Sequence, residues 1–347
     1  MRTKVYRIAN ISSSVVLLAA LGACGGGGGS PTATQPVPTP TPTPPPVNTT
    51  PQTSTYSSGS GEKAVFEQLN AERGRCGFGF LKQNAQLDLA TADAIAYAKL
   101  RSAEGYASEL AFGHTEDPSK SGFTGVQPYD RAAYRGFNAL PVYESLHAHR
   151  QYTPITTTKD FTASKSLAVL MTTVYHLREQ VSTVTDVGIA HGEMLSLDNV
   201  YTSRLQMLFA TPTGSTWQAP MGVLTYPCDG TTAAAGAFTP SSESPNPAPD
   251  LGAISVGTPI YVRGPANTAL TSLAASVKLA AGGSDVPIRI LTSANDPQAM
   301  LYINDAFILP LQPLQAGQTY AVFITGISDG QAFSKTFSFT PAATVSW

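Results

Sequence analysis

The chain has 347 residues, a formal net charge of −2 and 13% charged residues. Because basic residues are not in excess, the composition provides no cationic stripe that would attract nucleic acid or an anionic membrane surface. The length is sufficient for two domains after removal of an export signal.

Residues 1–24 are predicted to be a lipoprotein signal peptide. Three basic residues precede an apolar stretch at 15–20 that is too short to span a bilayer. The sequence Leu-Gly-Ala-Cys at 21–24 resembles a bacterial lipobox, which predicts a membrane anchor of lipid on Cys24. The alternative is an ordinary signal peptide with a chance cysteine. The next residue is Gly rather than Asp, so in a two-membrane bacterium we expect sorting to the outer membrane or cell surface.

Residues 25–61 are predicted to be a disordered tether. The segment has no charged residue, opens with five glycines and continues with prolines among Thr, Ser and Gln. Such a composition cannot bury a core, and Pro-Thr repeats favour an extended chain. At about 3.1 Å per residue the tether would reach on the order of 100 Å.

From Glu62 the pattern becomes helical and then mixed. Apolar residues at 65, 66 and 69 predict a first helix, Asn84 is expected to cap a second, and Pro128 and Gly136 bound a short third. An apolar stripe over 167–181 predicts a fourth, and strands are predicted at 187–190 and 206–210. Helices on both faces of an antiparallel sheet are therefore expected over residues 62–230.

Residues 231–250 are rich in Thr, Ala, Ser and Pro and are predicted to be a linker crossed by few contacts. Residues 251–347 show period-two alternation, which predicts a small all-β sandwich. They resemble bacterial Ig-like modules, and without His, Glu or Cys they are expected to act as a spacer or adhesive element. The expected strands lie at 260–262, 277–279, 288–291, 301–303, 319–325 and 333–340.

Two cysteines remain once Cys24 is assigned to lipid. In an oxidising compartment Cys76 and Cys228 are expected to form a disulfide. Closing so long a loop would constrain the unfolded chain by roughly 4–5 kcal/mol in the chain-entropy model. The alternative is a pair of buried thiols.

The strongest candidates for a functional site are His114, Glu144 and His176. Two imidazoles and a carboxylate could hold a divalent metal or transfer a proton. Their spacing alone does not distinguish one shared site from three separate side chains.

Six segments lie around these residues: Leu-Asn-Ala-Glu-Arg at 69–73, Phe-Gly-His-Thr-Glu-Asp at 112–117, Pro-Tyr-Asp-Arg-Ala at 128–132, Gly-Phe at 136–137, Thr-Val-Tyr-His-Leu-Arg at 173–178 and Val-Gly-Ile-Ala at 187–190. In their order and spacing they resemble the CAP superfamily of cysteine-rich secretory, venom-antigen and pathogenesis-related proteins, most of all its bacterial secreted members. The resemblance covers roughly residues 62–228. It implies a three-layer α-β-α sandwich with a His/Glu/Glu/His cleft, of which three members map onto His114, Glu144 and His176.

The fourth member of that cleft has no counterpart at the usual place. Many relatives carry a Trp and a Glu on the helix before the second His, whereas residues 169–173 here are Val-Leu-Met-Thr-Thr. Glu116 is the best spare carboxylate. Arg131 is expected to pair with an acid near the cleft rather than with a substrate.

Three functions remain open. The sequence lacks the His-Glu-x-x-His motif of common zinc peptidases. We favour a non-enzymatic binding module whose cleft takes zinc or another divalent cation and a lipid or cell-envelope ligand. The second hypothesis is a metal-assisted peptidase in which Glu144 is a ligand or base. The third is a purely structural hydrogen-bonded cluster.

The other histidines are weaker candidates. His147 and His149 would share one face of a strand and could bind a metal, although a solvated edge is the favoured interpretation. His191 is expected to be a surface residue.

Overall fold

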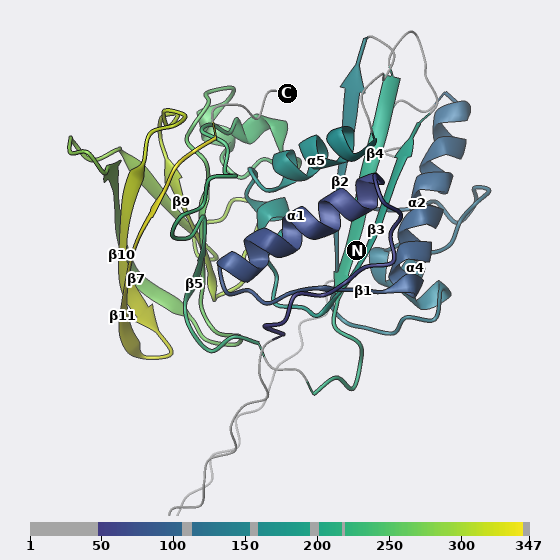
Figure 1. The fold of residues 1–347 in the computed structure, drawn as a ribbon, viewed down its shortest axis with the longest axis horizontal. Helices are drawn as coiled ribbons and strands as arrows, with labels where there is room; N and C mark the ends of the chain where they lie inside the picture. Colours follow the sequence, from purple (N-terminus) through teal and green to yellow (C-terminus); the bar gives the residue numbers. More distant parts are fainter. Residues whose placement is uncertain (1–47, 106–112, 153–158, 195–200, 217–218, 343–347) are drawn as a thin grey trace, which may run out of the picture. The chain divides into compact units, whose positions relative to one another are not determined.

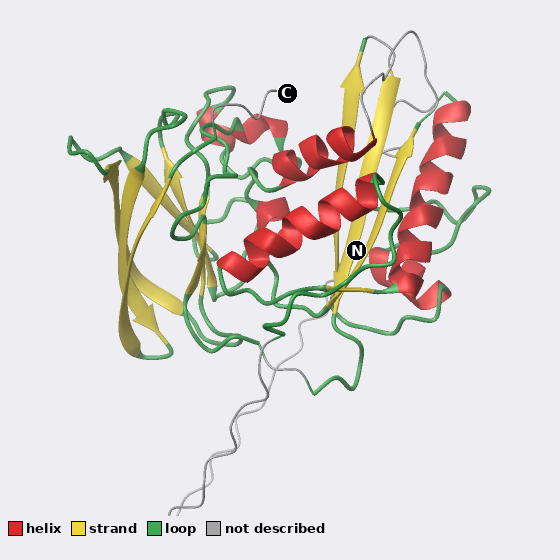
Figure 2. Cartoon of the chain, viewed as in Figure 1, coloured by secondary structure: helices red, strands yellow, loops and turns green. Residues whose placement is uncertain are grey.

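The protein is seen here in a computed structural model that describes residues 48–105, 113–152, 159–194, 201–216 and 219–342 (Figure 1). Within these ranges the chain is a mixed α+β protein, which confirms the coarse fold class (Figure 2). The predicted signal peptide, Cys24 and most of the tether lie outside the described residues. None of the helices in the described ranges is long and apolar enough to cross a membrane.

Five described helices belong to the first half of the chain. Ser60 and Asn84 cap the first two, since their side chains accept the backbone N–H groups of Lys63 and Gln86 at 3.2 and 3.0 Å. The cap predicted at Asn84 is therefore confirmed. The helices are α1 (Gly61–Arg75), α2 (Ala85–Ala103), α4 (Pro128–Tyr134), α5 (Lys159–Leu170) and α6 (Tyr175–Gln180).

A four-stranded sheet lies among these helices in the order β1-β3-β4-β2. The pairing of β1 with β3 is parallel, and the other two pairings are antiparallel. The strands are β1 (Lys82–Gln83), β2 (Val142–Gln151), β3 (Asp186–Glu193) and β4 (Tyr201–Ala210).

Helices cover both faces of this sheet, as Figure 1 shows with α1 and α5 on one side and α2 and α4 on the other. Along β4, Leu205, Met207 and Phe209 pack with α1 and α5, whereas Leu208 packs with α2. This is the period-two alternation of a strand that is buried on both sides. On β3, a Cβ at Gly188 would lie 2.1 Å from the backbone of Leu87, so the missing side chain lets α2 lie close against the sheet.

The fourth predicted helix is divided in two. Instead of one helix over 167–181, α5 ends at Leu170 and α6 begins at Tyr175. The hydroxyls of Thr172 and Thr173 donate to the carbonyls of Ala168 and Leu170, and such bonds compete with a continuing helix. His176 consequently lies in the first turn of a separate short helix.

The second half of the chain contains two further sheets, in the orders β5-β6-β9-β8 and β11-β10-β7. Their apolar faces share one buried cluster that includes Val262, Val277 and Val322. Residues 301–303, predicted as a strand, are not part of one. The strands are β5 (Leu224–Tyr226), β6 (Ile260–Arg263), β7 (Leu270–Leu279), β8 (Ile288–Thr292), β9 (Asp305–Pro310), β10 (Tyr320–Ser328) and β11 (Gln331–Phe339).

The two halves make more contacts than a linker at 231–250 leads one to expect. The described residues from 48 to 342 belong to one compact unit. Phe238, from inside the expected linker, and Tyr261 and Phe307, from beyond it, are buried in the same cluster as Phe78 and Leu177. Strand β5, which precedes the expected linker, pairs with β6, which follows it. The expectation of few contacts therefore differs from the structure, because the β5-β6-β9-β8 sheet supplies part of the apolar core around α1 and α6.

The expected tether also ends earlier than Gly61. The backbone carbonyl of Asn48 accepts the N–H of Phe80 at 2.9 Å. The ring of Tyr56 lies 5.9 Å from that of Phe66, and its hydroxyl bonds to Asp88 on α2. Residues 48–60 thus pack along α1 and α2 rather than extending the tether.

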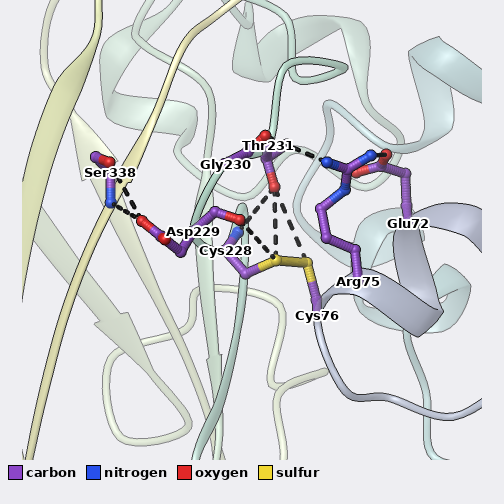
Figure 3. Close-up of a disulfide and its surroundings, with 8 residues drawn as sticks. All are labelled: Glu72, Arg75, Cys76, Cys228, Asp229, Gly230, Thr231 and Ser338. Carbon is purple, nitrogen blue, oxygen red and sulfur yellow. Dashed lines mark hydrogen bonds and ion pairs between the residues drawn. A yellow bond between two sulfur atoms is a disulfide. The ribbon is translucent and has the colours of Figure 1, made fainter. Parts of the chain in front are cut away.

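The predicted disulfide between Cys76 and Cys228 is confirmed, with Cα atoms 5.4 Å apart (Figure 3). It joins the end of α1 to the segment after β5. The next residue, Asp229, accepts the backbone N–H of Ser338 on β11 at 2.9 Å. Arg75 also donates to the carbonyl of Gly230 at 3.3 Å. The disulfide therefore holds α1 beside the chain segment that enters the second half.

Candidate functional site

His114 and Glu144 form the first half of the site. Nδ1 of His114 lies 2.9 Å from Oε2 of the buried Glu144. The other carboxylate oxygen, Oε1, accepts hydrogen bonds from the guanidinium of Arg131 at 2.5 Å and from the side-chain amide of Gln206 at 2.6 Å. Burial alone would raise the pKa of Glu144, but the charge of Arg131 and the bond and charge of His114 outweigh it and lower that pKa to about 2. Glu144 is therefore an ionised group whose two oxygens already accept three donors.

The pairing expected for Arg131 is confirmed by this contact. Its guanidinium also donates to the backbone carbonyl of His114 at 3.1 Å. Arg131 comes from α4, so the short helix bounded by Pro128 and Gly136 fixes both His114 and the carboxylate that holds it.

His176 and Glu243 form the second half. Nδ1 of His176 lies 2.9 Å from Oε1 of Glu243, whose side chain is fully buried. Burial opposes a charge on His176, but the bond and charge of Glu243 and the charge of Glu179 outweigh it and raise the pKa of the imidazole. Glu243 belongs to the segment predicted as a linker, so sequence analysis did not select it.

A second carboxylate, Glu179, lies on the same helix as His176. Residues three apart in a helix lie on one side, which brings Glu179 and His176 to the same cavity. Ser145 donates to Oε2 of Glu179 at 2.8 Å. Burial raises the pKa of Glu179, although the charges of His176 and His114 and the hydrogen bond from Ser145 work against that increase.

The two histidines come together, as the resemblance led us to expect. Their ring centroids are 6.3 Å apart, with an angle of 27° between the planes. Both line a cavity of about 290 Å³ together with Glu144 and Glu179, and both line an adjoining cavity of about 200 Å³. Tyr129, Tyr143, Tyr175, Pro245 and Met300 supply much of the wall of the larger cavity.

Metal ligation at this site would have to begin from the two imidazoles. Within the described residues, no group of three or more His, Cys, Asp or Glu side chains is arranged to hold a metal ion. Glu144 lies beside His114 as predicted, but its contacts with Arg131 and Gln206 suit a positioning role better than that of a third ligand. With Nδ1 of each imidazole bonded to a carboxylate, Nε2 is the atom left for a metal or a ligand.

Glu116 does not replace the missing member of the cleft. Its carboxylate accepts the backbone N–H groups of Thr124 at 2.8 Å and Gly125 at 3.3 Å. It lies 3.8 Å from Nε of Arg131 and lines neither of the two cavities that contain both histidines. Glu116 therefore shapes the 124–125 loop, and the carboxylates at the cleft are Glu144, Glu179 and Glu243.

The remaining histidines bond to neutral side chains. His147 and His149 lie on β2 as predicted, and Nδ1 of His147 lies 3.1 Å from the hydroxyl of Ser166. Burial and the nearby His149 and His176 lower the pKa of His147 to about 4. His191 is half-buried, and its Nε2 lies 3.5 Å from Thr162.

Two site residues were missed from the sequence, and only one had a local signal. Glu179 lies at i+3 from His176 in a helical segment, a spacing that predicts a shared face. Glu243 is the only charged residue between Gly230 and Asp250. A lone acid in a Ser/Pro segment is conspicuous, but nothing local connects it with a histidine 67 residues earlier.

Comparison with known proteins gives no family for this chain. No protein-family model matches it, and no curated protein matches it. A solved structure of a DUF4426 family protein from Pseudomonas aeruginosa is similar to 34% of this chain and 87% of its own, with 20% sequence identity and a TM-score of 0.20. A likeness at that TM-score carries no argument about fold or function.

Proposed function

We propose that this protein is a binding module of the bacterial cell envelope, with a cleft in which Nε2 of His114 and Nε2 of His176 hold a divalent cation. The observation that supports this most is common to both imidazoles. Each has its Nδ1 at 2.9 Å from a buried glutamate, Glu144 for His114 and Glu243 for His176.

A metal-binding imidazole almost always donates its other ring N–H to a carboxylate, a backbone carbonyl or water, and here the partner is a carboxylate in both cases. The carboxylate accepts a hydrogen bond from Nδ1–H, which keeps the proton on Nδ1, leaves the Nε2 lone pair available and makes it more basic. It also fixes the orientation of the ring, so less entropy is lost when the metal binds. Two histidines prepared in this way beside one cavity favour zinc or a similar borderline cation over calcium or magnesium, which prefer oxygen ligands.

The geometry favours an open site over a closed structural one. A structural zinc ion has four protein ligands, whereas the described residues here offer two imidazoles at the cleft. The remaining positions would be taken by water and by a polar group of the bound ligand. The Tyr, Pro and Met side chains of the cavity wall suit an amphiphilic ligand, such as a lipid or another envelope component.

The second candidate is a metal-assisted peptidase, and Glu179 rather than Glu144 favours it. Glu144, with a pKa of about 2, is a poor general base. Glu179 is buried at the same cavity with a raised pKa, as a residue that accepts a proton from a metal-bound water requires. Peptide cleavage by the zinc-loaded chain that is lost in Glu179→Gln, with zinc still bound, would favour this function over simple binding.

The wider assignment belongs to the same proposal. The segments that resemble the CAP superfamily, together with helices on both faces of the four-stranded sheet, support a three-layer α-β-α sandwich of that kind. The two C-terminal sheets and their shared cluster support an Ig-like β-sandwich. The lipobox-like 21–24 and the uncharged segment after it support a lipid anchor on Cys24 and a place in the outer membrane or at the cell surface.

Zinc calorimetry on the purified chain tests the cleft. Wild type is expected to bind zinc at neutral pH, whereas His114→Ala, His176→Ala and the double variant lose that binding. His191→Ala, a histidine outside both cavities, is the matched control and retains it. A protonated imidazole cannot bind metal, so the affinity should decrease as the pH is lowered. Because the pKa of His176 is raised, that decrease should already begin at a pH higher than the ordinary imidazole pKa of 6.5. Tight binding that survives in the double variant would move the site, with His147 and His149 tested next. If folded wild type binds no zinc, the remaining hypothesis is that the cleft residues form a purely structural hydrogen-bonded cluster.

A further inference from the structure

Glu243 accepts hydrogen bonds from one short stretch of chain. Its Oε2 accepts the backbone N–H of Val174 at 2.8 Å, and its Oε1 accepts those of Tyr175 and His176 at 2.8 and 3.1 Å. Its side chain is fully buried and is the only charged one between Gly230 and Asp250. A buried carboxylate is costly unless it is fully hydrogen-bonded, and these N–H groups lower that cost.

The imidazole of His176 is a further donor to the same carboxylate. Nδ1 lies 2.9 Å from Oε1, the oxygen that also accepts the N–H of Tyr175 and of His176 itself. One side chain therefore fixes both the backbone at the start of α6 and the ring that this backbone carries. A carboxylate that served only the backbone would not need the ring nitrogen at hydrogen-bond distance.

We propose that Glu243 is the positioning residue of His176, so that the segment after the disulfide completes the cleft by fixing the imidazole with its proton on Nδ1 and its lone pair on Nε2. The inference rests on the proposed function, in which Nε2 of His176 binds the cation. It assigns to a residue outside the CAP-like region the role that Glu144 has for His114 within it.

The neighbours of Glu243 in the chain support this assignment. Ser244 lines both cavities that contain the two histidines, and Pro245 lines the larger one. A ligand that binds beside His176 would therefore contact this segment directly. The other titratable groups that face His176 are Glu179 on α6, His114 before α4 and His147 on β2. Among the described residues, Glu243 is the side chain that bonds to Nδ1 of His176.

The test uses the full chain labelled with [¹⁵N]histidine, which has five histidines to resolve. The ¹⁵N shifts of His176 above its titration range identify the nitrogen that carries the proton. Wild type is expected to show the Nδ1–H form. Glu243→Ala should change that signature to the mixture found for a free imidazole and weaken zinc binding by roughly 10- to 100-fold. Glu243→Gln keeps an acceptor oxygen and should recover part of both.

The control is Asp296→Asn. Asp296 lies beyond the same segment and also accepts backbone N–H groups, those of Met300 and Leu301, as well as the hydroxyl of Tyr175, but no imidazole. It should leave the His176 signature unchanged. If Asp296→Asn changes the ¹⁵N signature of His176 as much as Glu243→Ala does, both variants loosen α6 in a general way, and the positioning role of Glu243 is wrong.

The proposal and the proposed function fail in different ways. If wild type binds no zinc but its His176 is in the Nδ1–H form, the metal site is wrong and Glu243 remains the positioning residue. Wild type whose His176 carries its proton on Nε2 overturns the role of Glu243, and this holds even if the Glu243 variants do not fold. Unchanged shifts in a folded Glu243→Ala variant overturn it as well.

Discussion

Arg178 of α6 and Asp305 of β9, 127 residues apart in the chain, form a buried ion pair with 2.6 Å between Nε and Oδ2. The second oxygen of Asp305 accepts the hydroxyl of Tyr261 at 2.6 Å. The helix that carries His176 and Glu179 is thus bonded directly to the second half of the molecule, and the cleft depends on that half for its geometry.

Asp305→Ala is expected to destabilise the whole chain by about 3–5 kcal/mol, because it leaves the guanidinium of Arg178 buried without its acid. Urea unfolding of the purified protein measures the change. The control is Asp250→Ala, which breaks the ion pair with the half-exposed Arg289 and should have little effect. Equal losses in the two variants would contradict a special role for the Arg178–Asp305 pair.

A chain that ends near Gly230 is expected to aggregate or to lose cooperative unfolding. The truncation removes Tyr261 and Phe307, which share a buried cluster with Phe78 and Leu177, and exposes that apolar surface to water. Gel filtration and thermal melting compare it with a chain that begins at residue 48 and retains both halves. Cooperative melting of a monomeric truncated chain would restore the linker interpretation of residues 231–250.

Stability is expected to fall in acid in two successive steps. His147 has a folded pKa of about 4 against an ordinary 6.5, so the unfolded chain binds the extra proton and stability decreases as pH falls from 6.5 to 4. Glu144 has a folded pKa of about 2 against 4.5, so its contribution is complete above 4.5 and is lost as pH falls towards 2. Each step is on the order of 3 kcal/mol at most.

Urea unfolding at several pH values separates these two steps. His147→Gln should remove the first step and leave the second. His149→Gln, on the same face of β2, removes one of the charges that lower the pKa of His147 but not its burial, so it should keep most of the first step and all of the second. His176, whose pKa is raised, acts in the opposite direction above pH 6.5, where its contribution is lost as the pH rises. A first step that persists in His147→Gln would assign it to another group.

Reduction of Cys76–Cys228 is expected to lower the melting temperature. The disulfide spans 152 residues, for which the chain-entropy model gives about 5 kcal/mol of stabilisation. Non-reducing peptide mapping of exported protein should recover one crosslinked peptide pair, and Cys76→Ser with Cys228→Ser should melt as the reduced protein does. Two alkylatable thiols in native exported protein would contradict this prediction.

Palmitate labelling in a bacterial host tests the anchor on Cys24. Wild type is expected to incorporate label and Cys24→Ser to incorporate none, because only the thiol accepts the diacylglycerol. Cys76→Ser is the matched control and should label like wild type. The same label in Cys24→Ser as in wild type, or none in either, would remove the lipid anchor from the proposal.

The sequence by itself determined the features whose cause is local. Asn84 predicts a helix start because its side chain bonds to N–H groups two and three residues later. Gly136 marks the end of a helix because it adopts a φ of +82°, which other residues disfavour. The pairing of Cys76 with Cys228 followed from having two cysteines left in an exported chain.

Only the tertiary structure decided which side chains complete the cleft. The periodicity around Val174 predicts one helix, whereas the structure has two, and a carboxylate 67 or more residues later accepts the N–H groups at the start of the second, α6. A residue such as Glu243 has no periodicity and no motif, and its Ser/Pro surroundings are typical of a linker. Its role arises from a contact with His176, which lies 67 residues earlier in the chain. The free energy of that contact depends on burial, which no local sequence pattern encodes.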